Sequence, residues 1–426
     1  MVNETINTIS KLGIITTLLV LGTYNRIFAL AAFFIVAVLI IKGNNAVGWL
    51  IYLNSFSAIF KLSPTGQSMT IILIMLYVLY SVCQNHALSR TFVFRFIIFG
   101  VFVLVSSTSN YDIARIVKFF FGIIFVYYAL SHISIKSNLW TVLKYYIWGV
   151  IVSSIIAYSG IINNSSAYFA EKTLGYVDAY QSRFAGMYSD PNYYVINVII
   201  AICLLEILGI NKKISKIYEY GLLMVLVLFS FLTLSKSAII MLLIPIFVII
   251  IYCFQIKDYK KLIGVSGLLA IVLMLIFSLN IPQLATILGR FSRVTDINTL
   301  TTGRFYIWNT YFDYFNTNLG KCLFGSGVGA PLVNYRAAHN TYIDFIFYFG
   351  VTGSILFIYL IAYFNKREYM WKRSIVNYSV YYSILLSYMA LSETFYFDFP
   401  IHILLAATVF RLEDFVIKAD CNDLSQ

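Results

Sequence analysis

The chain has 426 residues, of which 60% are hydrophobic, 18% aromatic and only 11% charged. Soluble domains average about 45 to 50% apolar and about 25% charged residues, so this composition excludes a water-soluble protein. The formal net charge of +12 would indicate nucleic-acid binding in a soluble protein. Membrane proteins concentrate Lys and Arg in cytoplasmic loops, and we therefore expect no nucleic-acid partner.

Long apolar runs follow one another along the chain. Residues 194–208 and 237–254 are nearly continuous apolar stretches of helix length, whereas membrane barrel strands alternate polar and apolar residues. We therefore predict an all-α, polytopic integral membrane protein with about 12 to 14 transmembrane helices. The predicted spans are approximately residues 12–24, 27–41, 46–60, 69–83, 92–107, 114–131, 139–162, 193–210, 220–234, 237–254, 262–281, 340–364, 376–391 and 400–411.

The basic residues in the loops predict the orientation of these spans. If both termini are cytoplasmic, most loop Lys and Arg residues lie inside, and the short outer loops carry only Arg26, Lys61, Arg115 and Lys236. The N-terminus lacks a charged region, an apolar region and a cleavage site in succession, so we predict no removable signal peptide. The first span then serves as its own insertion signal.

Two of the predicted outer segments are long, residues 163–192 and 282–338. We predict that the whole chain, residues 1–426, is a single multi-pass membrane domain that includes both. Connections in compact proteins are usually short, and long ones usually carry function or are disordered. The composition of these two segments is not typical of disorder. We therefore expect the functional residues in these two extracytoplasmic loops.

The second long loop contains a helical pattern of aromatic residues. Trp308, Tyr311, Phe312 and Phe315 recur at the spacing of one helix face. We predict an amphipathic helix over about residues 303–317, on or above the outer membrane face. Thr302 is its predicted N-cap, and Gly320 is predicted to lie just past its end.

The two long loops are rich in arginine. Their basic residues are Lys172, Arg183, Arg290, Arg293, Arg304, Lys321 and Arg336. The planar guanidinium grips phosphate oxygens bidentately, so this set predicts an anionic, phosphorylated ligand, with surface ion pairing and headgroup contacts as the alternative for each single Arg. Lys236, in a tight outer turn, either anchors that turn or points at the same anion.

Metal and nucleotide sites are not indicated. The outer loops contain no Asp-x-Asp pair that could hold a divalent cation on a diphosphate, so we expect neither a metal nor another cofactor. The run GSGVGA at residues 325–330 is not followed by Lys-Ser or Lys-Thr and is predicted to face outward, which argues against a nucleotide site.

His339 stands where the second long loop returns to the membrane, and it is the only His beside a long outer loop. A neutral imidazole there can accept a proton from a sugar hydroxyl as a general base, and the alternative is a local role at the helix start. In the first long loop, Asp190 before Pro191 predicts a turn and a helix start with Pro at the first helical position. Arg183, seven residues earlier, has no such structural role.

Three groups of residues, taken together, resemble the O-antigen polymerase and O-antigen ligase superfamily of lipid-linked oligosaccharide transferases. The resemblance lies in their order, spacing and placement on the long outer loops, and it covers roughly residues 140–365. The earlier spans match only in hydropathy. The groups are Arg183, Gly186, Asp190, Pro191 and Asn192; Gly303, Arg304 and Trp308; and Gly325, Gly327, His339, Asn340 and Gly350.

This resemblance implies an enzyme that takes a glycan from undecaprenyl diphosphate and attaches it to an acceptor sugar hydroxyl, without metal, on the outer face of the bacterial cytoplasmic (inner) membrane. It implies that His339 orients or deprotonates the acceptor and that Arg183 and Arg304 bind the leaving diphosphate. Arg336 and Arg290 are expected to assist on charge and position alone. The remaining candidates for substrate binding are Lys236, Asp190, Asn192 and Asn340.

Within the superfamily we favour a polymerase that joins repeat units into O-antigen or capsular polysaccharide, with a lipid-linked oligosaccharide as both donor and acceptor. The alternative is a ligase that moves finished glycan to a lipid A core. A second alternative is a flippase or transporter of the same lipid, although the sequence shows no clear internal repeat or interrupted helix. Membrane lipid is an expected contact, and a chain-length regulator and a flippase of the same pathway are candidate partners.

Overall fold

A computed structural model provides the structure of the chain. It describes residues 2–43, 45–61, 68–84, 87–108, 110, 112–132, 138–162, 184–188, 190–233, 235–255, 257, 259–260, 262–264, 266–267, 270, 274, 295–301, 303–364, 382, 384–387, 389 and 401–412. Over these residues the secondary structure is helical, apart from one isolated bridge between Lys61 and Ser68. The predicted all-α membrane protein is therefore confirmed.

The chain forms two compact units, each described by itself below. Unit 1 comprises Met1–Tyr80 and Lys136–Ile287, and unit 2 comprises Ser81–Ile135 and Leu288–Gln426. The helices of unit 1 are α1 (Val2–Gly22), α2 (Arg26–Ile41), α3 (Ala46–Asn54), α7 (Asn138–Ser159), α8 (Pro191–Ile210), α9 (Lys216–Leu232) and α10 (Lys236–Gln255), and α4 (Met69–Cys83) crosses the boundary. Those of unit 2 are α5 (Arg90–Ser106), α6 (Ile113–His132), α13 (Ile297–Leu300), α14 (Arg304–Thr317), α15 (Leu319–Phe324), the 3₁₀ turn η1 (Val333–Tyr335), α16 (Thr341–Ile361) and a helix at Ile401–Leu412.

By length and composition, four described helices can cross a membrane: Ile113–His132, Leu139–Ser159, Pro191–Ile210 and Thr341–Ile361. Shorter apolar helices include Arg26–Ile41 and Met69–Cys83. These bounds follow the predicted spans closely. The predicted span 262–281 lies largely outside the described residues, as does the span 376–391.

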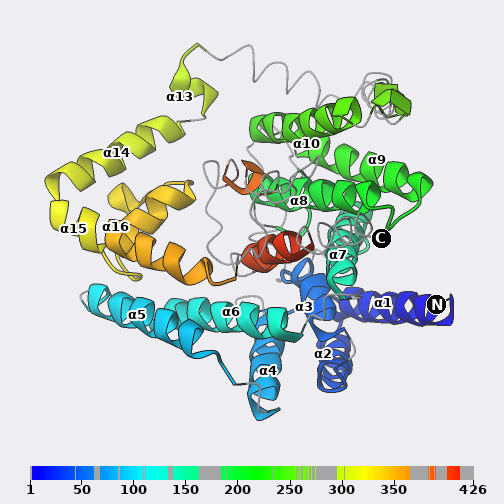
Figure 1. The fold of residues 1–426 in the computed structure, drawn as a ribbon, viewed down its shortest axis with the longest axis horizontal. Helices are drawn as coiled ribbons and strands as arrows, with labels where there is room; N and C mark the ends of the chain where they lie inside the picture. The colour runs from blue at the N-terminus through cyan, green and yellow to red at the C-terminus, as the bar shows by residue number, and fades with distance from the viewer. Residues whose placement is uncertain are drawn as a thin grey trace, which may run out of the picture. The chain divides into compact units, whose positions relative to one another are not determined.

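Unit 1 is built around α8, whose side chains are almost all buried. Helix α8 packs against α7, α9 and α10, which Figure 1 shows in green, and α7 in turn packs against α3. Tyr146 of α7 donates a hydrogen bond to the Asn197 side chain of α8 (2.9 Å), and Tyr194 donates one to Ser154 (2.7 Å). Polar groups inside this apolar unit are thus satisfied by neighbouring helices, as burial requires.

Unit 2 has an aromatic core between α5, α6 and α16. Phe99 of α5 and Phe119 of α6 both pack against Phe349 and Phe357 of α16, with ring centroids 5.5 to 5.8 Å apart. Tilted and edge-on ring pairs of this kind add to the stability gained from burial. This core holds α16, the helix that follows His339, against α5 and α6.

Helix α16 is interrupted at Gly350, where the backbone leaves the helical region (φ +66°, ψ 177°). The carbonyls of Phe347 and Tyr348 accept hydrogen bonds from the backbone N–H groups of Ser326 (2.7 Å) and Gly327 (3.1 Å). A Cβ on Gly350 would overlap the Leu323 carbonyl. The break and the loop after α15 therefore form one backbone-to-backbone contact, the glycine clamp, which the sequence did not reveal as an interrupted helix.

Helix α14 forms over the predicted residues, and Gly320 lies just past its end as predicted, but the predicted N-cap was wrong. Its N-cap is Gly303, at φ +81°, where a glycine is favoured, and the Thr301 hydroxyl accepts from the Phe305 N–H (3.2 Å). The predicted cap Thr302 lies outside the described residues. At the other end Asn318 is the C-cap, and Gly320 belongs to α15.

Candidate functional site

The aromatic face of α14 packs against the segment that leads to His339. The Trp308 Nε1–H donates to the Ala338 carbonyl (2.9 Å), and the Tyr311 hydroxyl donates to the Arg336 carbonyl (2.8 Å). Tyr311 and Phe315 are buried, whereas Phe312 is 50% exposed and does not share this buried face. Two of the four aromatic residues, Trp308 and Tyr311, therefore hold this segment in place.

Tyr311 remains a hydrogen-bond donor at any physiological pH. Burial raises the pKa of its hydroxyl above the usual range, and the nearby Asp344 carboxylate raises it further. Asp344 is itself buried in the first turn of α16. Sequence reasoning did not assign Asp344 to the site, and its position five residues after His339 was the only signal available.

His339 has a left-handed backbone (φ +48°) and is half-buried. This region is uncommon for residues other than glycine, with Asn, Asp and His enriched in it, and such conformations gather at functional sites. The next residue, Asn340, is the N-cap of α16, and its side chain accepts from the N–H groups of Tyr342 (3.0 Å) and Ile343 (3.2 Å). The turn and the cap together place the backbone of His339 at the start of α16.

Two predicted arginines lie near this turn. Arg304 is the first residue of α14, one helical turn before Trp308, and it is half-buried. Arg336 is exposed, and its carbonyl is held by Tyr311. In unit 2, Arg304 thus begins the helix whose Trp308 and Tyr311 hold the segment that carries Arg336 and leads to His339 and Asn340. Arg290, also predicted to assist, lies outside the described residues.

The glycines of the sequence motif position this arrangement. Gly325 (φ +85°) and Gly327 (φ +90°) both have left-handed backbones, and a Cβ on Gly325 would overlap the Tyr348 carbonyl. A Cβ on Gly327 would lie 2.9 Å from the Ser107 Cα in the turn between α5 and α6. These glycines permit close backbone approach to α16 and to that turn.

Unit 1 gathers a second set of predicted residues. Asp190 is the N-cap of α8 and accepts from the Asn192 N–H (2.6 Å), with Pro191 at the first helical position, as predicted. The Asn192 side chain accepts from the Ser235 hydroxyl (2.6 Å), and the next residue, Lys236, begins α10. Asp190, Asn192 and Lys236 therefore lie at the same end of the unit.

Arg183 lies outside the described residues, but its neighbour Phe184 is held firmly. The Phe184 N–H donates to the Leu232 carbonyl at the end of α9 (3.1 Å), and its ring stacks on Phe229 (5.7 Å between centroids). Gly186 has φ +54°, and a Cβ there would overlap the Tyr194 ring. The Arg-x-x-Gly motif therefore leads directly into the end of unit 1 that carries Asn192.

Among the described residues, no group of three or more His, Cys, Asp or Glu side chains comes close enough to hold a metal ion. The candidate chemistry of the described residues is instead that of an imidazole with guanidinium and amide groups. Cations of this kind stabilise a leaving phosphate as it gains charge.

Comparison with known proteins agrees with this chemistry. Residues 221–358 match the family model described as O-antigen ligase. The matched residues include Arg304, Arg336, His339 and the clamp residues Gly327 and Gly350. This match over residues 221–358 supports the O-antigen polymerase and ligase superfamily.

The resemblance seen in the sequence is thereby confirmed. Members of the O-antigen polymerase and ligase superfamily are glycosyl-transferring membrane enzymes, and the apolar helices of this chain accord with that. No curated protein matches the chain, and no solved structure does.

Proposed function

We propose that the chain is a polysaccharide polymerase, which transfers glycan from undecaprenyl diphosphate to the sugar of another lipid-linked repeat unit at the outer face of the bacterial inner membrane. The match of residues 221–358 to the O-antigen ligase family carries the proposal. The placement of Arg304, Arg336 and His339 in unit 2 supports the choice of site.

In the proposed reaction the acceptor hydroxyl oxygen attacks the anomeric carbon of the donor glycan. The bond from that carbon to the diphosphate oxygen breaks, and its electron pair leaves with the diphosphate. His339 takes the proton of the acceptor hydroxyl, and Arg183 and Arg304 bind the leaving diphosphate. Because the diphosphate gains charge as the bond breaks, pre-placed guanidinium groups stabilise the transition state more than the ground state.

A ligase that moves finished glycan to a lipid A core is the second candidate, favoured by the description of the matched family. A flippase is supported less well. Transporters use broken helices to coordinate substrates or ions. At the break in α16 the Phe347 and Tyr348 carbonyls instead accept hydrogen bonds from the loop after α15.

The test is the gel ladder of surface polysaccharide from a deletion strain complemented with wild type, His339→Ala, His339→Asn or Arg304→Gln at matched protein levels. Asn tolerates the left-handed backbone of position 339, so His339→Asn removes the imidazole while keeping the turn. Loss of a general base typically costs about 10² to 10⁴ in rate, so we expect both His339 variants to lose the ladder.

The accumulating product distinguishes the candidates. Single repeat units attached to the lipid A core identify a polymerase, because ligation then proceeds without polymerisation. Full-length polymer retained on undecaprenyl diphosphate identifies a ligase, and repeat units held at the inner face identify a flippase. A normal ladder from His339→Asn would overturn the role of the imidazole.

A further inference from the structure

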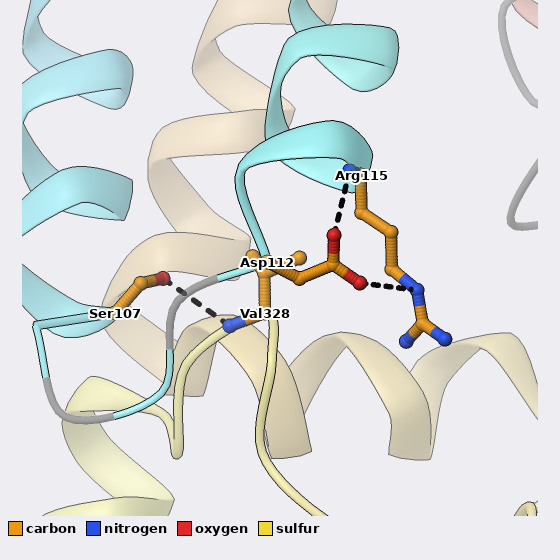
Figure 2. Close-up of polar contacts among 4 residues, drawn as sticks. All are labelled: Ser107, Asp112, Arg115 and Val328. Atoms are coloured by element: carbon orange, nitrogen blue, oxygen red, sulfur yellow. Dashed lines mark hydrogen bonds and ion pairs between the residues drawn. The ribbon is translucent and has the colours of Figure 1, made fainter.

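A third arginine, Arg115, is held in an ordered position at the start of α6. The Asp112 carboxylate accepts from both the backbone N–H of Arg115 (3.1 Å) and its Nε (3.0 Å). Figure 2 shows that the two terminal nitrogens of the guanidinium point away from this carboxylate. The Arg115 side chain is 43% exposed. The terminal nitrogens therefore remain for partners other than Asp112.

Arg115 also reaches α16. Its guanidinium lies close to the hydroxyl of Tyr348, a buried residue two positions before the break at Gly350. The Asp344 carboxylate lies close enough to Tyr348 and Tyr311 to influence both hydroxyls electrostatically. The Tyr311 hydroxyl in turn donates a hydrogen bond to the Arg336 carbonyl. A chain of polar neighbours thus leads from Arg115 to the segment that carries Arg336.

The turn before Arg115 is hydrogen-bonded to the glycine-rich loop at residues 325–330. The Ser107 hydroxyl accepts from the Val328 N–H (3.2 Å), as Figure 2 shows, and the Asn110 amide donates to the Ser326 carbonyl (3.0 Å). The Asn110 carbonyl accepts from the Gly329 N–H (2.9 Å). Arg115 therefore sits on a turn whose position is set by the same loop that clamps α16.

A purely structural role accounts poorly for this arrangement. Exposed ion pairs contribute about 0 to 1 kcal/mol to stability, and a short polar side chain would cap α6 as well as Asp112 does without any Arg. Lys118 lies one turn later on the same helix, so two cations accompany one carboxylate in the first two turns of α6. Positive charge beyond what pairing with Asp112 requires is typical of an anion site.

We propose that Arg115 is a further substrate-binding residue whose terminal nitrogens bind a phosphate group carried on a membrane lipid, with Asp112 and Tyr348 as positioning residues. The inference rests on the proposed function, in which that phosphate belongs to the polyprenyl diphosphate. A phospholipid headgroup offers the same chemistry, and the experiment separates these two sources.

The experiment measures lipid binding to the purified full-length protein in detergent by native mass spectrometry. The probes are undecaprenyl diphosphate and phosphatidylglycerol, and the variants are Arg115→Gln, Arg115→Lys and Tyr348→Phe. Arg26→Gln is the matched control, because Arg26 is also a predicted outer-loop Arg in the first turn of a helix, in unit 1. Melting temperatures show whether each variant remains folded.

We expect Arg115→Gln to weaken undecaprenyl diphosphate binding about tenfold to a hundredfold, because charged hydrogen bonds are lost. Arg115→Lys should lose less, and Tyr348→Phe should lose less than Arg115→Gln because the charge remains. Arg26→Gln should bind like wild type. A structural role of Arg115 would lower the melting temperature without this graded loss of affinity.

Unchanged diphosphate affinity in a folded Arg115→Gln variant would overturn the inference. A loss confined to phosphatidylglycerol would also overturn the substrate role and assign Arg115 to the bilayer. Binding is measured without turnover, so this outcome is separate from the polysaccharide ladder that tests the proposed function.

Discussion

At the scale of single residues, the described site depends on backbone carbonyls being held in place. Trp308 and Tyr311 each donate one side-chain hydrogen bond to the segment before His339. A net hydrogen bond contributes about 0.5 to 1.5 kcal/mol, so each contact is modest alone. Their joint effect is on geometry, because a small displacement of a catalytic group is costly in rate.

The double variant Trp308→Phe with Tyr311→Phe tests this role. It keeps both aromatic rings in the packing and removes both donors, so we expect a melting temperature within a few degrees of wild type and a loss of polymer of about tenfold or more. Polysaccharide yield at matched protein level measures the effect. Tyr306→Phe is the control, since Tyr306 lies on the same helix and is 62% exposed. Equal yields from the double variant and wild type would contradict the positioning role.

Predictions about single residues succeeded where the structure depends only on neighbouring residues in the sequence. Asp190 before Pro191 predicts an N-cap from side-chain chemistry alone, and the structure confirms it. The start of α14 was misassigned because Gly303 adopts a left-handed backbone, which depends on the approach of the preceding turn Ile297–Leu300. Arg115 was predicted only as an outer-loop cation, because its contact with Tyr348 joins residues far apart in sequence.

At the scale of secondary-structure elements, the glycine clamp is the feature most sensitive to substitution. Gly350→Ala places a Cβ against the Leu323 carbonyl at φ +66°, and such a position strongly disfavours any residue with a side chain. We expect a loss of at least about 1 to 2 kcal/mol, measured as a lower melting temperature in detergent. Gly320→Ala is the matched control, because a Cβ at Gly320 meets nothing within 4 Å.

The outcome for Gly320→Ala should be neutral or slightly stabilising, because Ala favours helix more than Gly does. If Gly350→Ala melts at the same temperature as Gly320→Ala, the close backbone contact does not contribute to stability. Loss of the polysaccharide ladder with Gly350→Ala alone would then indicate an effect on the site only.

Hydrophobic runs predict the helices well and their interruptions poorly. The bounds of α2, α8 and α10 agree with the predicted spans to within two residues, because lipid requires continuous apolar sequence. The break in α16 was not predicted, since the residues around Gly350 are as apolar as those of an unbroken span. Its physical cause is the set of N–H donors at Ser326 and Gly327, which lie outside the span.

At the scale of the whole molecule, two long-range hydrogen bonds each join residues that are predicted to lie on the same side of the membrane. In unit 1 the Tyr24 hydroxyl donates to the Ile161 carbonyl (2.9 Å), and both residues lie at the predicted outer ends of their spans. In unit 2 the Ser89 and Tyr363 hydroxyls are 2.7 Å apart, and both are predicted to lie inside. Which face is outward remains a prediction from the Lys and Arg bias.

Cysteine labelling in intact cells tests that orientation. In a cysteine-free background, Thr108→Cys and Tyr335→Cys should react with a membrane-impermeant maleimide, whereas Lys216→Cys should react only after the cells are permeabilised. All three positions are exposed, so access to solvent alone does not separate them. The reverse pattern would place both termini outside and would remove the proposed site from the outer face.

The glycine clamp also makes the arc from Gly325 to Gly350 a unit that could be exchanged. Its two ends touch, so the chain enters and leaves the arc at one point, while the tip at Asn334 and Tyr335 is exposed. Insertions at this tip can change the local shape without displacing the ends of α15 or α16. Transplanting the whole arc between related enzymes would therefore carry the imidazole and its surroundings together, which offers a route to recombining acceptor preferences on one membrane scaffold.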